Sequence, residues 1–280
     1  MKKITRRSFL AAAGLSVAAL ALTACGGSSS SVASSVASSA AASSEAASTS
    51  AAAGELTTVE AGKLTMATNA TFPPYEMTTD AGTIEGIDVD TAQAIAEKLG
   101  LELQIDDMDF DAALLSVQQG KADIAMAGIT VTDERMAVMS FSDSYATGIQ
   151  SIIVPNDSDI ASPDDLAGKT IGTQRGTTGY IYCSDDFGDE NVVAYDDGLT
   201  AVQALNNGQV DAVVIDNAPA QEFVAANPGL KVLDTSYAEE DYAIGMAKGS
   251  ALEDAVNKAL EELKADGTLQ AIVDKYINAN

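Results

Sequence analysis

The 280-residue sequence has no histidine, no tryptophan and only two cysteines. Without histidine the chain cannot build a Ser-His-Asp or Cys-His catalytic group, nor a zinc site with imidazole ligands. Two cysteines are too few for a four-thiolate metal site or a disulfide framework. These absences exclude several common classes of hydrolase and metalloprotein.

Basic residues are also scarce, with 15 Lys and Arg against 41 Asp and Glu, which gives a formal charge of −26. A duplex nucleic-acid binder needs a basic face against the phosphates, so the composition predicts no nucleic-acid partner. Hydrophobic residues make up 46% of the chain, which is enough to bury a core and argues against disorder throughout. The length allows one large domain or two smaller ones.

The amino terminus has the order of an export signal. Four basic residues fall within the first seven positions, and an apolar stretch follows as far as Leu22. Residues 22–25, Leu-Thr-Ala-Cys, match the bacterial lipobox, in which the cysteine becomes the lipidated first residue of the mature protein. We therefore predict a lipoprotein signal peptide over residues 1–24 and lipidation of Cys25. Residues 5–10 also resemble the twin-arginine motif, and the export route stays open.

The segment after Cys25 has the composition of a flexible linker. Residues 26–53 are almost wholly Ser and Ala, with no periodic apolar face, so we predict a flexible linker over residues 25–61. A lipid followed by a spacer implies an exported protein that is held on the outside of the cell membrane. If Cys25 is lipidated, Cys183 has no partner, and we expect a buried or half-buried free thiol.

From residue 62 to residue 280 the sequence alternates between strand-like and helix-like patterns. We expect strands near residues 63–68, 101–105 and 123–127, with helices from Asp88 or Asp90 to Leu99 and over residues 112–119. The order recurs, with strands at 169–173, 191–194 and 211–215 and helices near Thr178 and over residues 199–206. Two βαβαβ units predict two similar α/β lobes, each with a mainly parallel sheet.

A short internal repeat supports this duplication. Residues 117–124 align with residues 205–212, and each places a Gly, two residues and then an Asp that opens a buried strand. The Asp residues of the two copies are Asp123 and Asp211.

Polar and aromatic residues follow four of the predicted strands. In open α/β sheets ligands bind beyond the carboxyl ends of the strands, so these four segments should line one cleft if the lobes face each other. They contain, in chain order, Asn69 and Phe72, then Gly128, Thr130 and Arg135, then Gln174, Thr177 and Thr178, and finally Asp216.

Two charged residues suggest the class of ligand. After removal of the signal only two arginines remain, Arg135 and Arg175, and both lie in strand-end segments. A guanidinium binds a carboxylate in a bidentate manner, and Asp216, at the end of an apolar strand, suits an ammonium partner. Together they match the two charged ends of an α-amino acid. The alternatives are a surface salt bridge of Arg135 with a neighbouring acid and helix capping by Asp216.

Five stretches in this part of the sequence resemble bacterial extracellular solute-binding proteins of the polar amino-acid family, which feed ABC importers. They are residues 67–76 (ATNATFPPYE), 86–90 (GIDVD), 108–110 (MDF), 127–135 (AGITVTDER) and 141–145 (FSDSY). The resemblance covers residues 62–280 and implies a two-lobed periplasmic-binding-protein-like α/β fold with a hinged cleft. Lobe one would comprise residues 62–147 and 246–280, and lobe two residues 148–245.

The resemblance also implies roles for individual residues. Arg135 would bind the ligand carboxylate with help from Thr130, the Gly128 backbone and the amides of Thr177 and Thr178. Asp216 would bind the α-ammonium. The side chain would lie between Phe72 and Phe110, for which core packing is the alternative role, and would be selected by Asn69 and Gln174.

The ligand implied is a polar amino acid, captured without a cofactor or metal by a monomer that docks on a membrane permease. Asn69 replaces an Asp that several relatives carry, which favours a neutral polar ligand such as glutamine or cystine. Arginine stays open because Glu76 and the acidic surface can contribute. The alternative functions are a dehydratase of the same fold family acting on a small cyclic carboxylate, and an extracellular sensor or adhesin.

Overall fold

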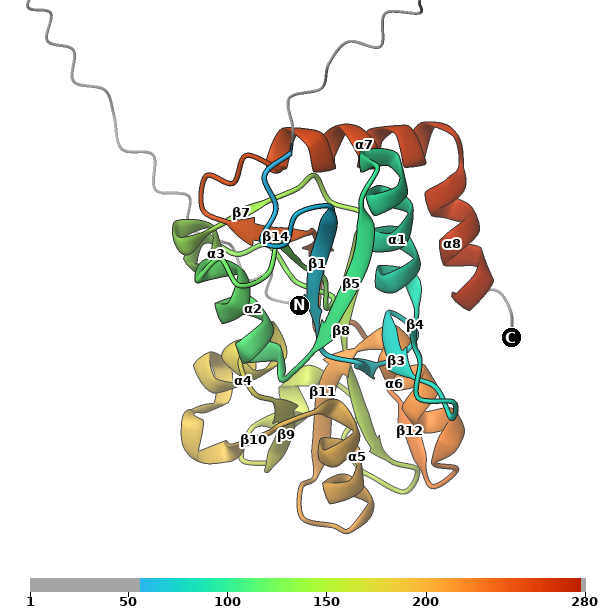
Figure 1. Ribbon diagram of the computed structural model, residues 1–280. Helices are drawn as coiled ribbons and strands as arrows, with labels where there is room; N and C mark the ends of the chain where they lie inside the picture. Colours follow the sequence, from blue (N-terminus) through green and yellow to red (C-terminus); the bar gives the residue numbers. More distant parts are fainter. Residues whose placement is uncertain (1–55, 278–280) are drawn as a thin grey trace, which may run out of the picture. The chain divides into compact units, whose positions relative to one another are not determined.

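The computed structural model describes residues 56–277 (Figure 1). The predicted signal peptide, Cys25 and almost all of the predicted linker lie outside the described residues. Within residues 56–277 no helix has the length and apolar character needed to cross a membrane.

The first sheet has the strand order β5-β1-β6-β14-β7 and is flanked by helices α1, α2, α7 and α8 (Figure 1). Its strands are β1 (Lys63–Thr68), β5 (Glu102–Asp107), β6 (Ile124–Ala125), β7 (Met139–Phe141) and β14 (Gly245–Ala247). The helices of this lobe are α1 (Ile87–Leu99), α2 (Phe110–Gln118), α3 (Asp133–Val138), α7 (Glu253–Ala265) and α8 (Thr268–Ile277). A small sheet of β2 (Thr71–Phe72), β3 (Glu76–Thr78) and β4 (Ile84–Glu85) lies between β1 and α1 in the chain.

The second sheet has the order β10-β9-β11-β8-β12, and β13 pairs with β8. Its strands are β8 (Ala146–Pro155), β9 (Ile171–Gln174), β10 (Val192–Tyr195), β11 (Ala212–Asp216), β12 (Leu230–Val232) and β13 (Ala238–Tyr242). The helices of this lobe are α4 (Thr178–Phe187), α5 (Gly198–Asn206) and α6 (Asn217–Ala226), with short 3-10 turns at Pro163–Leu166 and Asp189–Asn191.

Both sheets are mainly parallel, as expected, and each contains one strand that runs against the others, β14 in the first sheet and β8 in the second. The predicted βαβαβ units do form parallel strands, β5, β1 and β6 in one sheet and β10, β9 and β11 in the other. Of the remaining strands, β7, β12 and β13 run in the same direction as these, and they join the sheets through the reversed strands β14 and β8.

Helix α1 shows how the sequence pattern becomes packing. Val89, Ala92, Ile95 and Ala96 are buried on one face, as their spacing predicts, and Gly100 ends the helix with a φ of 70°. The helix begins at Ile87, slightly before the expected start at Asp88 or Asp90, and its N-cap is Gly86 with no side-chain cap. Asp88 is fully buried in the first turn, where it has another role described below.

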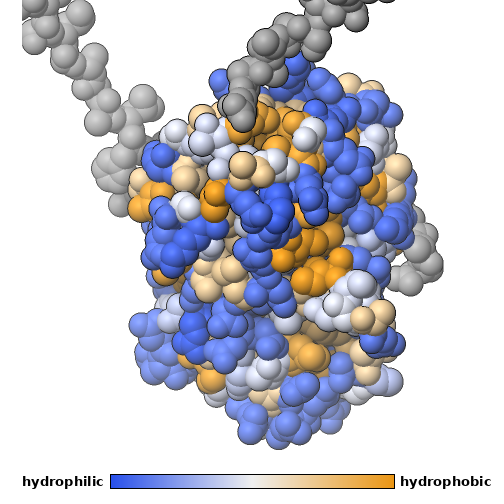
Figure 2. Space-filling view, viewed as in Figure 1, coloured by the Kyte–Doolittle hydropathy of each residue, from blue (hydrophilic) through white to orange (hydrophobic). Residues whose placement is uncertain are grey.

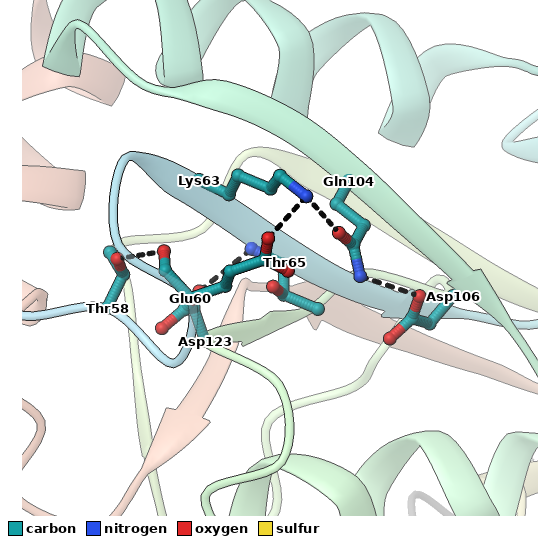
Figure 3. A network of polar contacts seen from close by, with 7 residues as sticks. All are labelled: Thr58, Glu60, Lys63, Thr65, Gln104, Asp106 and Asp123. Atoms are coloured by element: carbon teal, nitrogen blue, oxygen red, sulfur yellow. Dashed lines mark hydrogen bonds and ion pairs between the residues drawn. The ribbon is translucent and has the colours of Figure 1, made fainter.

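The short repeat corresponds to the same structure in both lobes. The backbone N–H of Asp123 donates to Thr65 O at 2.9 Å, and the Thr65 N–H donates to the Asp123 carboxylate at 2.8 Å. Asp211 and Thr170 exchange the same two bonds, each at 2.8 Å. In the first lobe Asp123 also accepts from the Val59 N–H at 2.8 Å, within a polar network at the start of the folded chain (Figure 3).

The surface in Figure 2 is mostly hydrophilic, with hydrophobic residues in small separate patches. This distribution agrees with the strongly acidic composition.

Candidate ligand-binding site

All ten residues predicted for ligand binding line one cavity between the two sheets. They are Asn69, Phe72, Phe110, Gly128, Thr130, Arg135, Gln174, Thr177, Thr178 and Asp216. Five further residues complete the lining: Glu76, Ala127, Gln150, Val214 and Ile215. The cavity lies where strand ends of both sheets meet, as the rule for open α/β sheets requires.

Arg135 is buried at the wall of this cavity, with 8% of its surface exposed. Its guanidinium donates to Thr130 O at 2.8 Å and, across the cleft, to Gly176 O at 3.1 Å. Its Cζ atom lies 5.3 Å from the centre of the Phe110 ring. Among the described residues no carboxylate forms an ion pair with it, so the surface salt bridge is not the role of Arg135. Burial lowers the pKa of Arg135, an effect that the charge of Glu240 opposes.

The amino terminus of α4 faces the same place. Thr177 is the N-cap and its hydroxyl accepts from the Tyr180 N–H at 3.3 Å. Thr177 and Thr178 both line the cavity, so the partial positive charge of the helix terminus adds to that of Arg135. This side of the cleft therefore suits a carboxylate.

Asp216 lies at the end of β11 and is 6% exposed. Its Oδ2 accepts from Gln150 Nε2 at 2.7 Å, and hydrogen bonds from the Tyr242 hydroxyl and from Gln150 partly oppose the rise in pKa that burial causes. It occupies the N-cap position of α6 but makes no side-chain cap bond, so capping does not explain it. Burial raises the pKa of Asp216 to about 7, and the nearby charge of Glu240 adds to this.

Gly128 occupies a position that requires glycine. Its φ is 55°, and a Cβ there would lie 2.7 Å from the Phe72 ring. Its N–H donates to Asp88 Oδ2 at 3.0 Å, which also accepts from the Tyr145 hydroxyl at 2.8 Å. In this conformation the Gly128 amide is thus engaged by Asp88 and is not free for a ligand carboxylate, contrary to what the resemblance implies.

Asn69 and Gln174 meet across the cleft. Gln174 Nε2 donates to Asn69 Oδ1 at 2.8 Å, and Asn69 Nδ2 donates to Met108 O at 3.0 Å. Phe72 is 8% exposed and stacks on Tyr75 with ring centres 5.7 Å apart, so it contributes both to the core and to the cavity wall. The two amides and the aromatic ring close one end of the cavity.

Glu240, on β13, is the main polar residue that sequence reasoning missed. It is 6% exposed, and its Oε2 accepts from Thr130, Thr178 and Gln150. A signal was present, because Ala238–Tyr242 has the period of a strand and Glu240 shares its face with the fully buried Tyr242.

Cys183 is a free thiol in the core of the second lobe, in agreement with the prediction. Burial raises its pKa to about 12, so the reactive thiolate is suppressed.

Comparison with known proteins gives consistent results. Residues 64–279 match the model of the bacterial extracellular solute-binding proteins, family 3. The chain is 32% identical over 225 residues to the L-cystine-binding protein TcyJ of Escherichia coli K12, covering 79% of this chain and 85% of TcyJ. It is 33% identical over 224 residues to the arginine-binding extracellular protein ArtP of Bacillus subtilis 168, covering 76% of this chain and 86% of ArtP.

Among solved structures, the arginine-, lysine-, histidine-binding protein ArtJ of Geobacillus stearothermophilus superimposes with a TM-score of 0.74 at 34% identity. The match covers 78% of this chain and 96% of that protein.

Proposed function

Because the chain belongs to the bacterial extracellular solute-binding proteins of family 3, we propose that it captures a polar α-amino acid between its lobes and delivers it to an ABC importer. One observation carries this proposal: Arg135 and Asp216 are both buried and both line one cavity. Arg135 has no ion-pair partner among the described residues. A free amino acid supplies the complementary charge for both groups at once.

In the proposed mode of binding, the ligand carboxylate contacts the guanidinium of Arg135 and the amino terminus of α4. The ligand ammonium contacts Asp216. Because these groups come from both lobes, ligand contacts stabilise the closed cleft, and binding shifts the population toward that form. The hinge would lie where the chain passes between the two sheets, just before Ala146 and between Tyr242 and Gly245.

The side chain of the ligand is proposed to be neutral and polar or cationic. Glu76, Asp216 and Glu240 are buried at or beside the cavity, where Arg135 is the one basic lining residue among those described. An acidic side chain would place a further negative charge beside these buried carboxyl groups, in a poorly solvated place. Cystine and arginine, named in the relatives TcyJ and ArtP, are both compatible with this charge balance.

The wider proposal places the protein outside the cell membrane, as family members are extracellular or periplasmic. A lipid on Cys25 and the Ser/Ala-rich linker would tether a monomeric binding domain close to its permease. The relatives are solute-binding proteins and not enzymes, which agrees with the prediction that the chain is not an enzyme. The dehydratase, sensor and adhesin alternatives are not favoured.

The experiment is a thermal-shift screen of the twenty amino acids, cystine and ornithine, followed by calorimetric titration of the ligand that stabilises most. Arg135→Ala should weaken binding by about 3 kcal/mol or more, because it removes one member of a buried charge pair. The matched control is Arg175→Ala, since Arg175 is exposed and pairs with Asp196 outside the cavity. Equal affinities for Arg135→Ala and the unaltered protein would refute the site.

A further inference from the structure

The carboxylate of Glu240 organises one side of the cavity without lining it. Its Oε2 accepts from the Thr130 hydroxyl at 3.1 Å, from the Thr178 hydroxyl at 3.0 Å and from Gln150 Nε2 at 2.9 Å. Thr130 belongs to the first lobe, whereas Glu240, Thr178 and Gln150 belong to the second. Thr130 also pairs with Tyr242 through the backbone, so its bond to Glu240 lies where the chain passes between the lobes.

These contacts determine which hydrogen-bond donors and acceptors stay free for a ligand. Each threonine hydroxyl has one proton, and the two hydroxyls lie 3.4 Å apart, farther than either lies from Glu240 Oε2. Because a carboxylate can only accept, the shorter contacts direct both hydroxyl protons at Glu240. Gln150 uses its amide nitrogen on Asp216 and on Glu240, at 2.7 and 2.9 Å. The hydroxyl oxygens keep only lone pairs for the cavity, and Gln150 keeps only its amide oxygen.

This arrangement divides the cavity into two chemically distinct sides. On the Arg135 side, a guanidinium and the terminus of α4 provide hydrogen-bond donors. On the Glu240 side, Thr130, Thr178, Gln150 and Asp216 can accept but have no hydrogen left to donate. A ligand carboxylate is matched by the first side and mismatched by the second, where an ammonium with three N–H donors fits.

We infer that Glu240 is a positioning residue that makes the site selective for an α-ammonium group, by fixing the hydroxyls of Thr130 and Thr178 as acceptors. The inference rests on the proposed function and refines it. Thr130, which the resemblance assigns to the ligand carboxylate, instead offers its hydroxyl oxygen to the ammonium. The backbone pairing of Thr130 with Tyr242 holds the Thr130 hydroxyl beside Glu240.

The test compares each amino acid with an analogue that lacks the α-amino group. The full-length protein and its Glu240→Gln variant are titrated with L-glutamine and glutaramate, and with L-arginine and δ-guanidinovalerate. If neither amino acid binds, the best ligand from the thermal-shift screen and its deaminated analogue replace them. Glu239→Gln is the matched control, because Glu239 is the exposed neighbour on the same strand.

We expect Glu240→Gln to weaken binding of the amino acid about tenfold or more and to leave binding of the analogue unchanged. Glu239→Gln should change neither. An equal loss for both ligands would overturn the inference, since it is the result for a residue that only holds the lobes together. Unchanged or tighter binding of the amino acid would overturn it as well.

A second variant covers the case in which Glu240→Gln does not fold, as judged by circular dichroism. Thr130→Val removes the acceptor oxygen directly and should produce the same selective loss for the amino acid. Loss of affinity for the analogue to the same extent would contradict the inference. If no amino acid binds the unaltered protein, the proposed function itself fails, and the two failures are thereby distinguished.

Discussion

The buried carboxyl groups around the cleft make its charge depend on pH. Asp216 has a pKa raised by burial to about 7, and Asp88, which holds the Gly128 amide, has a pKa raised by burial to about 6. Burial also raises the pKa of Glu76, next to Asp88, well above its usual value. An ammonium bound at Asp216 requires the ionised form, so amino-acid binding and proton release are linked.

This linkage gives a prediction for affinity. As the pH falls from 8 to 6, Asp216 of the free protein takes up a proton, and binding then has to expel it. Affinity for the amino acid should therefore fall about tenfold over this range, for a pKa of about 7. Calorimetry in buffers of different ionisation enthalpy would measure the proton released.

The control for this prediction is Asp216→Asn, which should bind more weakly at pH 8 and lose most of the dependence on pH. Any dependence that remains would come from Glu76 and Asp88. The stability of the unliganded protein should change in the opposite direction. A folded pKa above the unfolded value near 3.8 favours folding at low pH, and this contribution is lost as the pH rises through about 7. An affinity independent of pH in the unaltered protein would contradict the assignment of Asp216.

The sequence allowed some members of the site to be predicted and not others, for physical reasons. Arg135 could be found because it is one of two arginines outside the predicted signal peptide, and Asp216 because a carboxylate ends an apolar strand. Glu240 and Gln150 lie within strands β13 and β8 and not in the segments that follow strands, where ligand-binding residues were expected. Their roles depend on hydrogen bonds between residues 90 and 110 positions apart, which no local pattern records.

At the level of helices and strands, the internal repeat predicted that both lobes contain the same helix–turn–strand unit, which no single motif indicates. Gly120 and Gly208 end α2 and α5 in the same way, with φ values of 66° and 67°, and the following Asp ties the next strand to its parallel neighbour. Such contacts lie within one βαβ unit, and local patterns therefore predicted these strands and helices. The strands β8, β13 and β14 were not predicted as part of each sheet, because their pairing is set by how the lobes connect.

The repeat also offers a matched pair of substitutions. Asp123 is 6% exposed and accepts from both Thr65 and Val59, whereas Asp211 is exposed and accepts from Thr170. Asp123→Asn should lower the free energy of unfolding by about 1–3 kcal/mol, because one of two buried acceptors becomes an amide donor. Asp211→Asn should cost less than about 1 kcal/mol, since water replaces the lost bond. Urea unfolding of both variants would measure the difference.

The two substitutions should affect the stability of the protein without affecting ligand binding. Both Asp residues lie at the opposite end of their sheets from the cavity, so neither substitution should alter affinity for the amino acid at a temperature where the variant is folded. Equal losses of stability would show that the bond from Val59 to Asp123 contributes nothing.

For the molecule as a whole, the cleft is closed by few direct contacts between the lobes. Gln174 donates to Asn69, Arg135 donates to Gly176 O, and the hydroxyls of Thr130 and Thr178 lie 3.4 Å apart. Each such bond is worth roughly 1 kcal/mol, or somewhat more with a charged partner, against the entropy of holding two lobes together. The closed form without ligand is therefore only marginally favoured or disfavoured, and the ligand decides the balance.

Ligand addition should therefore narrow the distribution between open and closed conformations of the two lobes. Small-angle X-ray scattering of the unaltered protein should show a smaller radius of gyration when the amino acid is saturating, because contacts from both lobes meet on the ligand.

Gln174→Ala removes one bond across the cleft but keeps Arg135 and Asp216. It should scatter as a more open protein without ligand, close on ligand addition, and bind about fivefold more weakly, the equivalent of one neutral hydrogen bond. Arg135→Ala should stay open at the same ligand concentration. Identical scattering of the unaltered protein with and without a bound amino acid would show that the cleft does not close on its ligand, and the predicted effect of Gln174→Ala would then be absent too.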